Sequence, residues 1–409
     1  MGGSAEAVRV ALLTYRGNPR SGGQGVYVRH ISRALVRLGH HVEVFSGPPY
    51  PDLDPRVPLT CLPSLDLYRT EALFRPVRRP RGAVDLLELA TMCTGGFPEP
   101  LTFSLRAWAA LRRRLAEFDV VHDNQCLAYG ILGIRREGLP VLASIHHPVH
   151  IDRKLEIAHA TGGRRLSLRR WYGFTRMQAR VARRLPVLTV STSSRADIVR
   201  EMRVPPEQIS IVPLGVDADV FRPLPDRRRV PGRILVTTSA DVPLKGLAPL
   251  LRAFAIVRAR RPAELVVVGH PRQDGPIPGL LDQLALNGSV RFVGGVTDAA
   301  LVSLYAEAEA AVVPSLYEGF SLPAVEAMAC GLPLVATTGG ALPEVVGDGG
   351  LLVPPGDPQA LADQLTVLLD DAGLRRSLAA RGRRRVVDKL TWEATARATV
   401  EHYREVAGC

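Results

Sequence analysis

The sequence predicts an α/β protein made of two doubly wound parallel-sheet domains. Short runs rich in β-branched residues alternate with helical patterns along most of the chain, which is typical of parallel sheets covered by helices. The chain has 409 residues, enough for two domains of about 200 residues each. A turn-rich segment, Pro213–Pro225, lies near the midpoint and indicates the join between the two halves.

The expected strands follow the apolar runs. The first half contains VRVALLTY from Val8, HVEVFS from His41, DVVH from Asp119, VLASIH from Val141 and VLTVS from Val187. The second set contains ISIVP from Ile209, RILVTT from Arg233, ELVVVG from Glu264, VRFVG from Val290, AAVVP from Ala310 and LPLVAT from Leu332. Helical patterns between and after them include Val26–Leu38, Leu247–Ala259, Asp298–Ala308 and Trp392–Val406. Loops and helices are expected for Arg56–Gly96.

These runs place an N-terminal domain at residues 1–212 and a C-terminal domain at residues 231–390. A linker, 213–230, joins them, and a terminal helix occupies 391–409. In open parallel sheets, ligands bind outside the carboxyl ends of the strands. We therefore expect the binding residues on the loops that leave the strands, in a cleft between the domains.

The charge balance is strongly basic, with 52 basic and 40 acidic residues and a net charge of +12. All but three of the basic residues are arginines, and this bias, with abundant Ala, Gly and Pro, indicates a GC-rich coding sequence. The chain contains no recognisable nucleic-acid-binding module, so no nucleic acid partner is expected. The positive charge favours anionic ligands or an anionic membrane surface.

The cysteines and the apolar runs indicate a cytoplasmic protein. The five cysteines are scattered without metal-finger spacing, which is typical of reduced thiols. The sequence shows no export signal, and no apolar run approaches the roughly 18 residues that span a bilayer. We expect a soluble protein or one that is peripheral on the inner face of the membrane.

The stretch Tyr317–Gly331, YEGFSLPAVEAMACG, is the most informative of the chain. It places Glu318 and Glu326 eight positions apart around a helix start, with Pro323 in the first turn. A helix N-terminus presents free N–H groups and partial positive charge, which attract phosphates. A carboxylate accepts hydrogen bonds from vicinal hydroxyls, as in sugars. The combination favours a nucleotide-sugar.

Two further loops carry binding signals. Gly22, Gly23 and Gly25 follow the first strand and precede a helix, so backbone amides there can approach a ligand closely. Lys245 and Gly246 precede a helix in the second half. A lysine at this position fits a diphosphate contact, because a diphosphate needs cationic neutralisation.

The segment SLYEGFSLPAVEAMACGLPLVAT resembles the E-x7-E signature of family 4 retaining glycosyltransferases. The similarity extends through the Gly-x-Pro turn and the following strand, and the glycine loop with LGHHVEVF resembles the family's opening. It implies the GT-B fold, in which two Rossmann-like doubly wound parallel-sheet domains face a central cleft. It also implies transfer of a hexose from a UDP or GDP sugar to a hydroxyl of a saccharide, lipid or small molecule, with retention at the anomeric carbon.

The resemblance also implies residue roles. Donor contacts map onto Gly22, Gly23, Lys245, Gly269, Glu318, Gly319, Phe320, Ser321, Leu322 and Glu326. In the family, the second acid holds the ribose hydroxyls and the first holds the sugar, which assigns these roles to Glu326 and Glu318. In the family a histidine at the end of the strand SIHHPVH faces the donor sugar; the register favours His146, with His147 as the alternative. His146 and Glu318 are therefore the expected catalytic residues. The acceptor-side candidates are His122, Asn124 and His147.

No cofactor is expected, and no metal. The acidic pairs Asp52–Asp54 and Asp217–Asp219 lie in turn-rich contexts and are interpreted as loops. One departure from the family concerns the phosphate clamp, where Ser239 and Ala240 stand in place of the usual arginine. Two alternatives therefore stay open: a catalytically silent sugar-nucleotide-binding regulator, and a GT-B sugar-nucleotide epimerase, which would need no acceptor.

The segment Arg164–Arg184 contains eight arginines, with Trp171, Phe174 and Val181 near one helical face. A basic amphipathic helix can lie on anionic lipid. The favoured interpretation, however, is a surface helix whose aromatic residues pack against the first domain.

Overall fold

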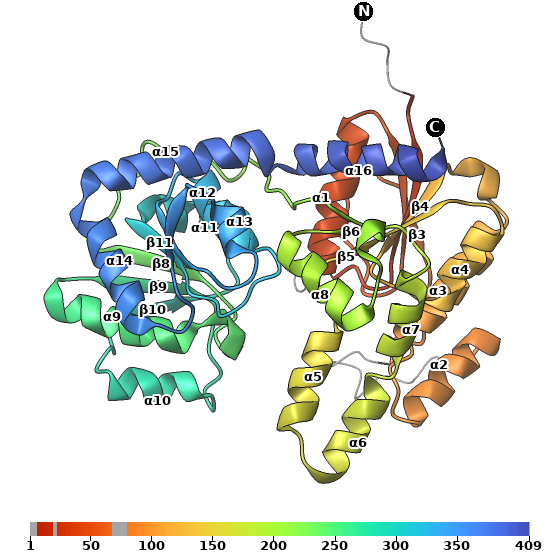
Figure 1. The fold of residues 1–409 in the computed structure, drawn as a ribbon, viewed down its shortest axis with the longest axis horizontal. Coiled ribbons are helices and arrows are strands. Elements are labelled where there is room, and N and C mark those ends of the chain that lie inside the picture. Colours follow the sequence, from red (N-terminus) through yellow and green to blue (C-terminus); the bar gives the residue numbers. More distant parts are fainter. Residues whose placement is uncertain (1–5, 19–22, 68–79, 409) are drawn as a thin grey trace, which may run out of the picture. The chain divides into compact units, whose positions relative to one another are not determined.

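The computed structural model describes residues 6–18, 23–67 and 80–408. Contacts divide this part of the chain into two compact units, each described here by itself (Figure 1). The first unit contains the residues up to Val190, Ser194–Val212 and the residues from Thr395 onward. The second contains Ser191–Ser193 and Pro213–Ala394.

The first unit is built on a parallel sheet of order β3-β2-β1-β4-β5-β6-β7. Its strands are β1 Arg9–Thr14, β2 His41–Ser46, β3 Leu59–Cys61, β4 Val120–Asn124, β5 Val141–Ile145, β6 Val187–Thr189 and β7 Ile209–Ile211. The run at Ile209, expected among the second set of strands, pairs with β6 at the edge of this first sheet. Strand β3 lies within the segment for which only loops and helices are expected. The strand order reverses direction between β1 and β4, which makes this pair the switch point of the sheet.

Helices cover both faces of the first sheet. They are α1 Gly23–Arg37, α2 Ala83–Cys93, α3 Glu99–Leu111, α4 Tyr129–Arg136, α5 His150–His159, α6 Gly162–Trp171, α7 Phe174–Ala182, α8 Thr192–Met202 and α16 Trp392–Ala407. Leu13, Val121 and Ala143 join one hydrophobic core with residues of α3, α4, α7 and α8. Because side chains alternate along a strand, His122 points to the opposite face. There it meets Tyr27 of α1 and Tyr403 of α16.

The arginine-rich segment Arg164–Arg184 forms two helices rather than one. Helix α6 ends at Trp171 and α7 begins at Phe174. The rings of Trp171 and Phe174 each lie 5.2 Å from the ring of Phe97. The aromatic residues of this segment therefore pack within the first unit.

The second unit is built on a parallel sheet of order β10-β9-β8-β11-β12-β13. Its strands are β8 Arg233–Thr237, β9 Glu264–Val268, β10 Val290–Val293, β11 Ala310–Val313, β12 Leu334–Thr337 and β13 Gly350–Val353. Its helices are α9 Leu247–Arg260, α10 Pro276–Gln283, α11 Asp298–Glu307, α12 Leu322–Ala329, α13 Leu342–Val346, α14 Pro358–Asp370 and α15 Ala372–Lys389. The switch point of this sheet lies between β8 and β11, which are paired in parallel.

The core of the second unit lies between the sheet and the pair α9 and α14. Leu250 and Phe254 of α9, with Leu361 and Leu365 of α14, are fully buried against Val267 and its neighbours. This packing fixes the start of α9, and with it the loop that carries Lys245. None of the helices in the described ranges is both long and apolar enough to cross a membrane.

Candidate active site

The switch point of the second sheet brings Lys245 next to Glu318. Lys245 ends a 3-10 turn, Pro243–Lys245, in the loop after β8, and Glu318 lies in the loop after β11. Gly246 holds these loops together, because its φ is +71° and a Cβ there would lie 1.9 Å from the carbonyl oxygen of Pro314. Only glycine fits this approach. The two loops that carry the predicted lysine and acid are therefore fixed against each other.

The Glu318 carboxylate is buried and fully engaged. Lys245 Nζ lies 2.9 Å from its Oε1 and 3.0 Å from its Oε2, and Ser315 Oγ donates to Oε1 at 2.7 Å. The backbone of Glu318 is fixed as well, since its carbonyl accepts the N–H of Ala341 at 2.8 Å. Charge-assisted hydrogen bonds of this kind are among the stronger polar contacts in proteins. Glu318 therefore has one defined orientation.

The loop Gly319–Leu322 leads into helix α12 through a strained residue. Ser321 has φ +91° and ψ +82°, a conformation that residues other than glycine rarely adopt. Its Oγ is buried and has no hydrogen-bond partner in the described part of the chain. Phe320 beside it is buried, and the N–H groups of the first turn of α12 are unpaired by the helix itself. An unsatisfied hydroxyl at a helix N-terminus is suited to an oxygen-rich ligand.

Glu326 lies on α12 in a different environment from Glu318. Burial raises its pKa to about 7, while a hydrogen bond from Tyr305 opposes this rise. Tyr305 Oη lies 3.2 Å from Glu326 Oε2 and 3.2 Å from Thr237 Oγ1 at the end of β8. The carboxyl group is thus oriented by a buried tyrosine, and with a pKa of about 7 both its neutral and its ionised forms are populated near neutral pH.

Gly269 directly follows β9 on the same edge of the sheet. Its φ is +144°, and a Cβ there would lie 2.2 Å from the carbonyl oxygen of Thr238. The absence of a side chain lets the loops after β8 and β9 approach each other. The second unit therefore carries Lys245, Gly269 and the whole loop from Glu318 to Leu322 at the carboxyl ends of its strands.

In the first unit, His146 is held at the end of β5. Its Nε2 lies 2.8 Å from Asn124 Oδ1, and its backbone N–H donates to Gln125 Oε1 at 2.8 Å. The amide nitrogen of Asn124 donates to the carbonyl oxygen of Gln24 at 3.4 Å. The Oδ1 of Asn124 therefore faces the imidazole, which donates from Nε2 and keeps Nδ1 as an acceptor. Burial lowers the pKa of His146 to about 4, so the ring is neutral at physiological pH.

His122 does not line an acceptor site in this structure, and its expected role is corrected. The side chain is fully buried, with Nδ1 2.6 Å from Tyr403 Oη and Nε2 2.7 Å from Ser144 Oγ. Both ring nitrogens are occupied, so no atom is left for a substrate. Asn124 is also buried and supports His146. His147 is part-exposed, with Nε2 3.2 Å from Asp152 Oδ1, and its acceptor-side role stays a prediction.

The glycine loop of the first unit is only partly described. Gly22 lies outside the described residues. Gly23 begins α1, is exposed, and has open space around the position of a Cβ. Gly25 is the glycine that packing demands, because a Cβ there would lie 2.1 Å from the carbonyl oxygen of Asn18.

Three supporting residues escaped the sequence analysis. Gln125, in a left-handed conformation with φ +57°, binds the backbone on both sides of the His146–His147 peptide. Ser315 and Tyr305 orient the two glutamates. Ser315 lies three residues before Glu318, which is a local signal. Tyr305 lies on the preceding helix, 21 residues before Glu326, and no local pattern links the two.

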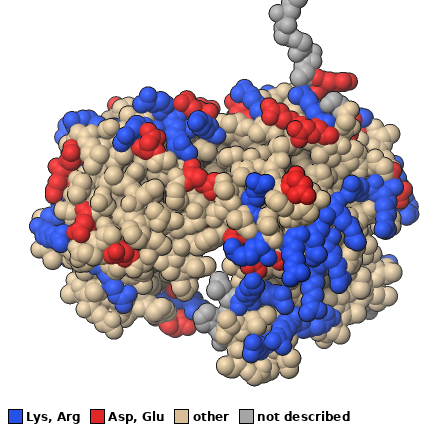
Figure 2. Space-filling view, viewed as in Figure 1, with Lys and Arg blue, Asp and Glu red and all other residues tan. Residues whose placement is uncertain are grey.

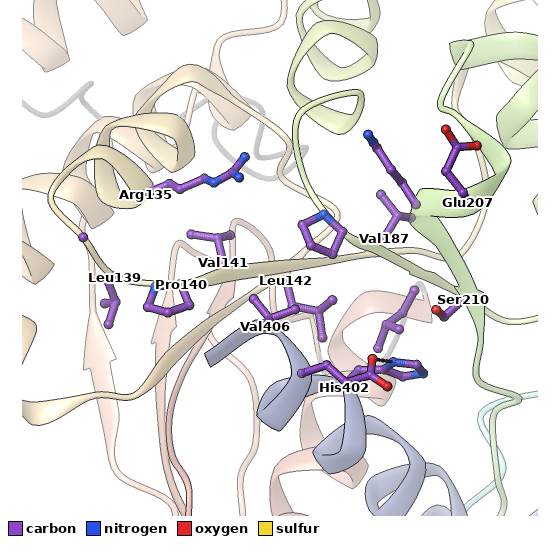
Figure 3. A pocket seen from close by; sticks show the side chains of 15 residues that line it. Arg135, Leu139, Pro140, Val141, Leu142, Val187, Glu207, Ser210, His402 and Val406 are labelled. Carbon is purple, nitrogen blue, oxygen red and sulfur yellow. Dashed lines mark hydrogen bonds and ion pairs between the residues drawn. The ribbon is translucent and has the colours of Figure 1, made fainter. Parts of the chain in front are cut away.

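A hollow of about 580 Å³ lies at the other end of the first sheet (Figure 3). It is lined by residues at the amino ends of β5, β6 and β7, among them Pro140, Val187 and Ser210, and by His402 of α16. It therefore lies away from the strand ends that carry His146. Among the described residues, no group of three or more His, Cys, Asp or Glu side chains could hold a metal ion.

Comparisons with known proteins give matches along nearly the whole chain. Residues 21–220 match the family model described as Glycosyltransferase Family 4, and residues 232–371 match the model described as Glycosyl transferases group 1. The chain is 51% identical to an MMP alpha-(1->4)-mannosyltransferase of Mycolicibacterium hassiacum, over 98% of this chain and 100% of that one. It is 32% identical to a D-inositol 3-phosphate glycosyltransferase of Thermobispora bispora, over 98% of this chain and 93% of the relative.

The solved structure of a sucrose-phosphate synthase from Thermosynechococcus elongatus has the same fold. The TM-score is 0.71 with 26% sequence identity, and the match covers 98% of this chain and 99% of the other. The two parallel-sheet α/β units are thus those of a GT-B glycosyltransferase.

Proposed function

Because the chain belongs to glycosyltransferase family 4, and is a hexosyltransferase, we propose that it transfers mannose from GDP-mannose to a saccharide hydroxyl with retention at the anomeric carbon. The 51% identity with a named mannosyltransferase over nearly the whole chain supports this donor. The relatives named as acting on D-inositol 3-phosphate are less similar, at 29–32% identity. The acceptor proposed first is therefore a mannoside rather than an inositol phosphate.

The observation that carries the proposal is the arrangement of Lys245, Glu318 and Ser321 at the switch point of the second sheet. A cation, a fixed carboxylate and an unpaired hydroxyl at a helix N-terminus lie on two neighbouring loops. A diphosphate would take the ammonium of Lys245 and the N–H groups of α12. The hydroxyls of the sugar would take the carboxylate of Glu318. Glu326 would hold the ribose of the donor.

The chemistry follows from where charge develops. The transition state of glycosyl transfer resembles an oxocarbenium ion. The departing diphosphate gains negative charge, which preorganised donors stabilise without moving. Lys245 and the first turn of α12 supply such donors. His146, neutral and with Nδ1 as an acceptor, would bind a sugar hydroxyl and place a lone pair near the developing positive charge.

We propose no catalytic metal and no covalent nucleophile. The cation next to the diphosphate would be Lys245, whose ammonium can donate beyond its two contacts to Glu318. Attack from the face that the leaving diphosphate occupies would then give retention.

The test is a turnover assay with GDP-mannose, UDP-glucose and GDP-glucose, each with methyl α-mannoside and short α-mannosides. Release of GDP that depends on acceptor, with a new α-anomeric signal in the NMR spectrum of the product, is the expected result. A β-anomeric product would overturn retention, and a requirement for a divalent cation, shown with EDTA, would overturn the metal-free mechanism.

The alternatives give different results in the same assay. An epimerase would change the sugar nucleotide without an acceptor. A silent regulator would bind GDP-mannose, measured by calorimetry, yet release no GDP with any acceptor. Glu318→Gln serves as the matched inactive variant, because it keeps the shape of the side chain and removes its charge.

We further propose that the first unit docks on an anionic membrane surface. Lys and Arg side chains gather on the face that carries α5, α6 and α7 (Figure 2). The eight arginines of Arg164–Arg184 are all exposed, and Leu166 among them has 67% of its surface exposed. Basic residues around an exposed apolar side chain suit the interface of anionic lipid. Co-sedimentation with phosphatidylglycerol vesicles should fall when Arg164, Arg165, Arg169 and Arg170 are changed to Gln. Equal binding of wild type to neutral vesicles would count against this docking.

A further inference from the structure

A ladder of four polar side chains lies on one face of β4 and β5, where a parallel sheet is usually apolar. His122 and Asn124 are two residues apart on β4, so they share a face, and Asn124 is paired with Ser144 of β5. His146 follows two residues after Ser144. The side chains bond across the strands: His122 Nε2 to Ser144 Oγ at 2.7 Å, and His146 Nε2 to Asn124 Oδ1 at 2.8 Å.

Two helices extend the first of these bonds in both directions. Tyr403, on α16 near the C-terminus, is fully buried, and its hydroxyl lies 2.6 Å from His122 Nδ1. Tyr27, on α1, is hydrogen-bonded through its hydroxyl to Ser144. The result is a continuous chain of contacts, Tyr403–His122–Ser144–Tyr27, that connects α16 with α1. The two tyrosines are 376 positions apart in the sequence.

The chain ends against the residue expected to bind the donor sugar. The ring of Tyr27 lies 4.5 Å from the imidazole of His146 at 58° and 6.0 Å from that of His122 at 76°. Tyr27 therefore packs directly against the His146 imidazole. The imidazole is held by Asn124 through one bond and by the tyrosine ring through packing. The His146 imidazole could rotate only if Tyr27 moved.

The imidazole of His122 sets which groups donate and which accept along this series of hydrogen bonds. A neutral imidazole has one donor and one acceptor nitrogen, so it accepts from one hydroxyl and donates to the other. Burial lowers the pKa of His122 to about 3, which keeps it neutral. Removal of the Tyr403 hydroxyl leaves His122 Nδ1 without its partner, and removal of the Tyr27 hydroxyl takes one of the two partners of Ser144. In both cases the remaining buried groups must rearrange.

We propose that Tyr403, His122, Ser144 and Tyr27 are positioning residues that set the orientation of His146, so that α16 acts on the sugar-binding end of the first unit. Their part in turnover rests on the proposed function, whereas their effect on His146 does not. The groups that face His146 are Tyr27 from α1, Asn124 and His122 from β4, and Gln125 after β4. The neighbouring His147 lies 3.2 Å from Asp152 of α5.

The first experiment measures three test variants: Tyr403→Phe, Tyr27→Phe, and the double variant that carries both changes. Each is compared with a control variant, Thr399→Val. Thr399 is the matched control, because it is also fully buried on α16, and its hydroxyl bonds only the carbonyl of Thr395 among the described residues. Each tyrosine variant should lower kcat with GDP-mannose about tenfold, as expected when a reacting group is misplaced by a fraction of an ångström. The Kd for GDP should stay within twofold of wild type, because the proposed diphosphate contacts lie in the second unit. Both changes interrupt the same chain of hydrogen bonds. The kcat of the double variant should therefore fall about tenfold, as in each single variant, and not a hundredfold.

The second experiment needs no turnover. In protein labelled with ¹⁵N at histidine, the ring signals of His146, assigned with His146→Asn, should show the Nε2–H tautomer. They should shift in Tyr403→Phe and not in Thr399→Val. Unchanged His146 signals in Tyr403→Phe would overturn the proposal, whatever the activity. Equal losses of kcat in Thr399→Val and Tyr403→Phe would also overturn it, because that result indicates a general packing defect. If the wild-type protein is inactive with every donor, but the His146 signals still shift in Tyr403→Phe, only the proposed function is contradicted.

Discussion

The affinity for GDP-mannose should depend on pH through Glu326. Burial raises the pKa of this carboxyl group to about 7 in the ligand-free protein. In the proposed function Glu326 holds the ribose of the donor, and only the ionised carboxylate can accept hydrogen bonds from both ribose hydroxyls. Binding of the donor therefore favours the ionised form and must overcome protonation at low pH. The affinity for GDP-mannose therefore falls as the pH falls through 7.

The magnitude can be worked from the pKa. If only the ionised form binds, the apparent Kd is multiplied by 1 + 10^(pKa − pH). This factor is about 11 at pH 6 and about 1.1 at pH 8, so affinity should rise about tenfold between them, or about 1.4 kcal/mol. The diphosphate of GDP-mannose is esterified at both ends and does not titrate in this range, which makes it a better probe than GDP. His146 is neutral throughout, because its pKa is about 4.

The assay is isothermal titration calorimetry of GDP-mannose at pH 6, 7 and 8. Glu326→Gln keeps a group that can bond Tyr305 but cannot ionise, so its Kd should be independent of pH and weaker than that of wild type at pH 8. Asp123 is the necessary control, because burial also raises its pKa to about 7. A pH dependence that persists in Glu326→Gln and disappears in Asp123→Asn would refute the assignment to Glu326.

Three further variants test the loops around the diphosphate. Lys245→Met should weaken GDP-mannose binding by at least about tenfold, because charged hydrogen bonds contribute about 1.5–3 kcal/mol; calorimetry beside Lys389→Met, an exposed lysine on α15, checks this, and equal affinities would contradict it. Gly246→Ala should lower the free energy of unfolding by about 2 kcal/mol or more, since its φ is +71° and its Cβ would meet the Pro314 carbonyl; a urea titration like that of wild type would show the loop to be adaptable. Ser321→Gly should raise the melting temperature by about 2–4 °C, because glycine adopts φ +91° without strain, and a lower melting temperature would show that the serine hydroxyl stabilises the free protein.

Much of the fold could be predicted because parallel strands in α/β proteins are apolar and regularly spaced. Helices such as Leu247–Arg260 and Asp298–Glu307 match the expected patterns within one residue. Strands β3 and β13 were missed, because β3 has only three residues and β13 begins with glycine after a glycine-rich turn. The position of β7 depends on its pairing with β6. The pairing of two strands cannot be predicted from a short apolar run in the sequence.

The contacts of the site were harder to predict than its loops. Strand ends and glycines predict where a ligand could bind, as at Lys245 and Gly269, because these signals are local. What a polar residue faces depends on the other elements packed on the sheet. His122 shows this limit: its place at a strand end suggests a ligand contact, yet Tyr403 and Ser144 occupy both of its nitrogens. The helix that carries Tyr403 lies 281 positions later in the chain.

The two glutamates of the E-x7-E stretch act in different ways because their partners differ. Glu318 has a cation, Lys245, at 2.9 Å, and a serine hydroxyl at 2.7 Å. Glu326 has a tyrosine hydroxyl at 3.2 Å, and burial raises its pKa to about 7 against the opposing effect of that bond. A buried carboxylate without a cation is costly, so the pairing of Glu318 with Lys245 stabilises the site before the donor binds. If a diphosphate binds as proposed, Lys245 would share its charge between the phosphate and Glu318, and the ion pair would be restored when the diphosphate leaves. In the proposed function, Lys245 would therefore serve both states of the site: it would pair with Glu318 before the donor binds and with the leaving diphosphate during transfer.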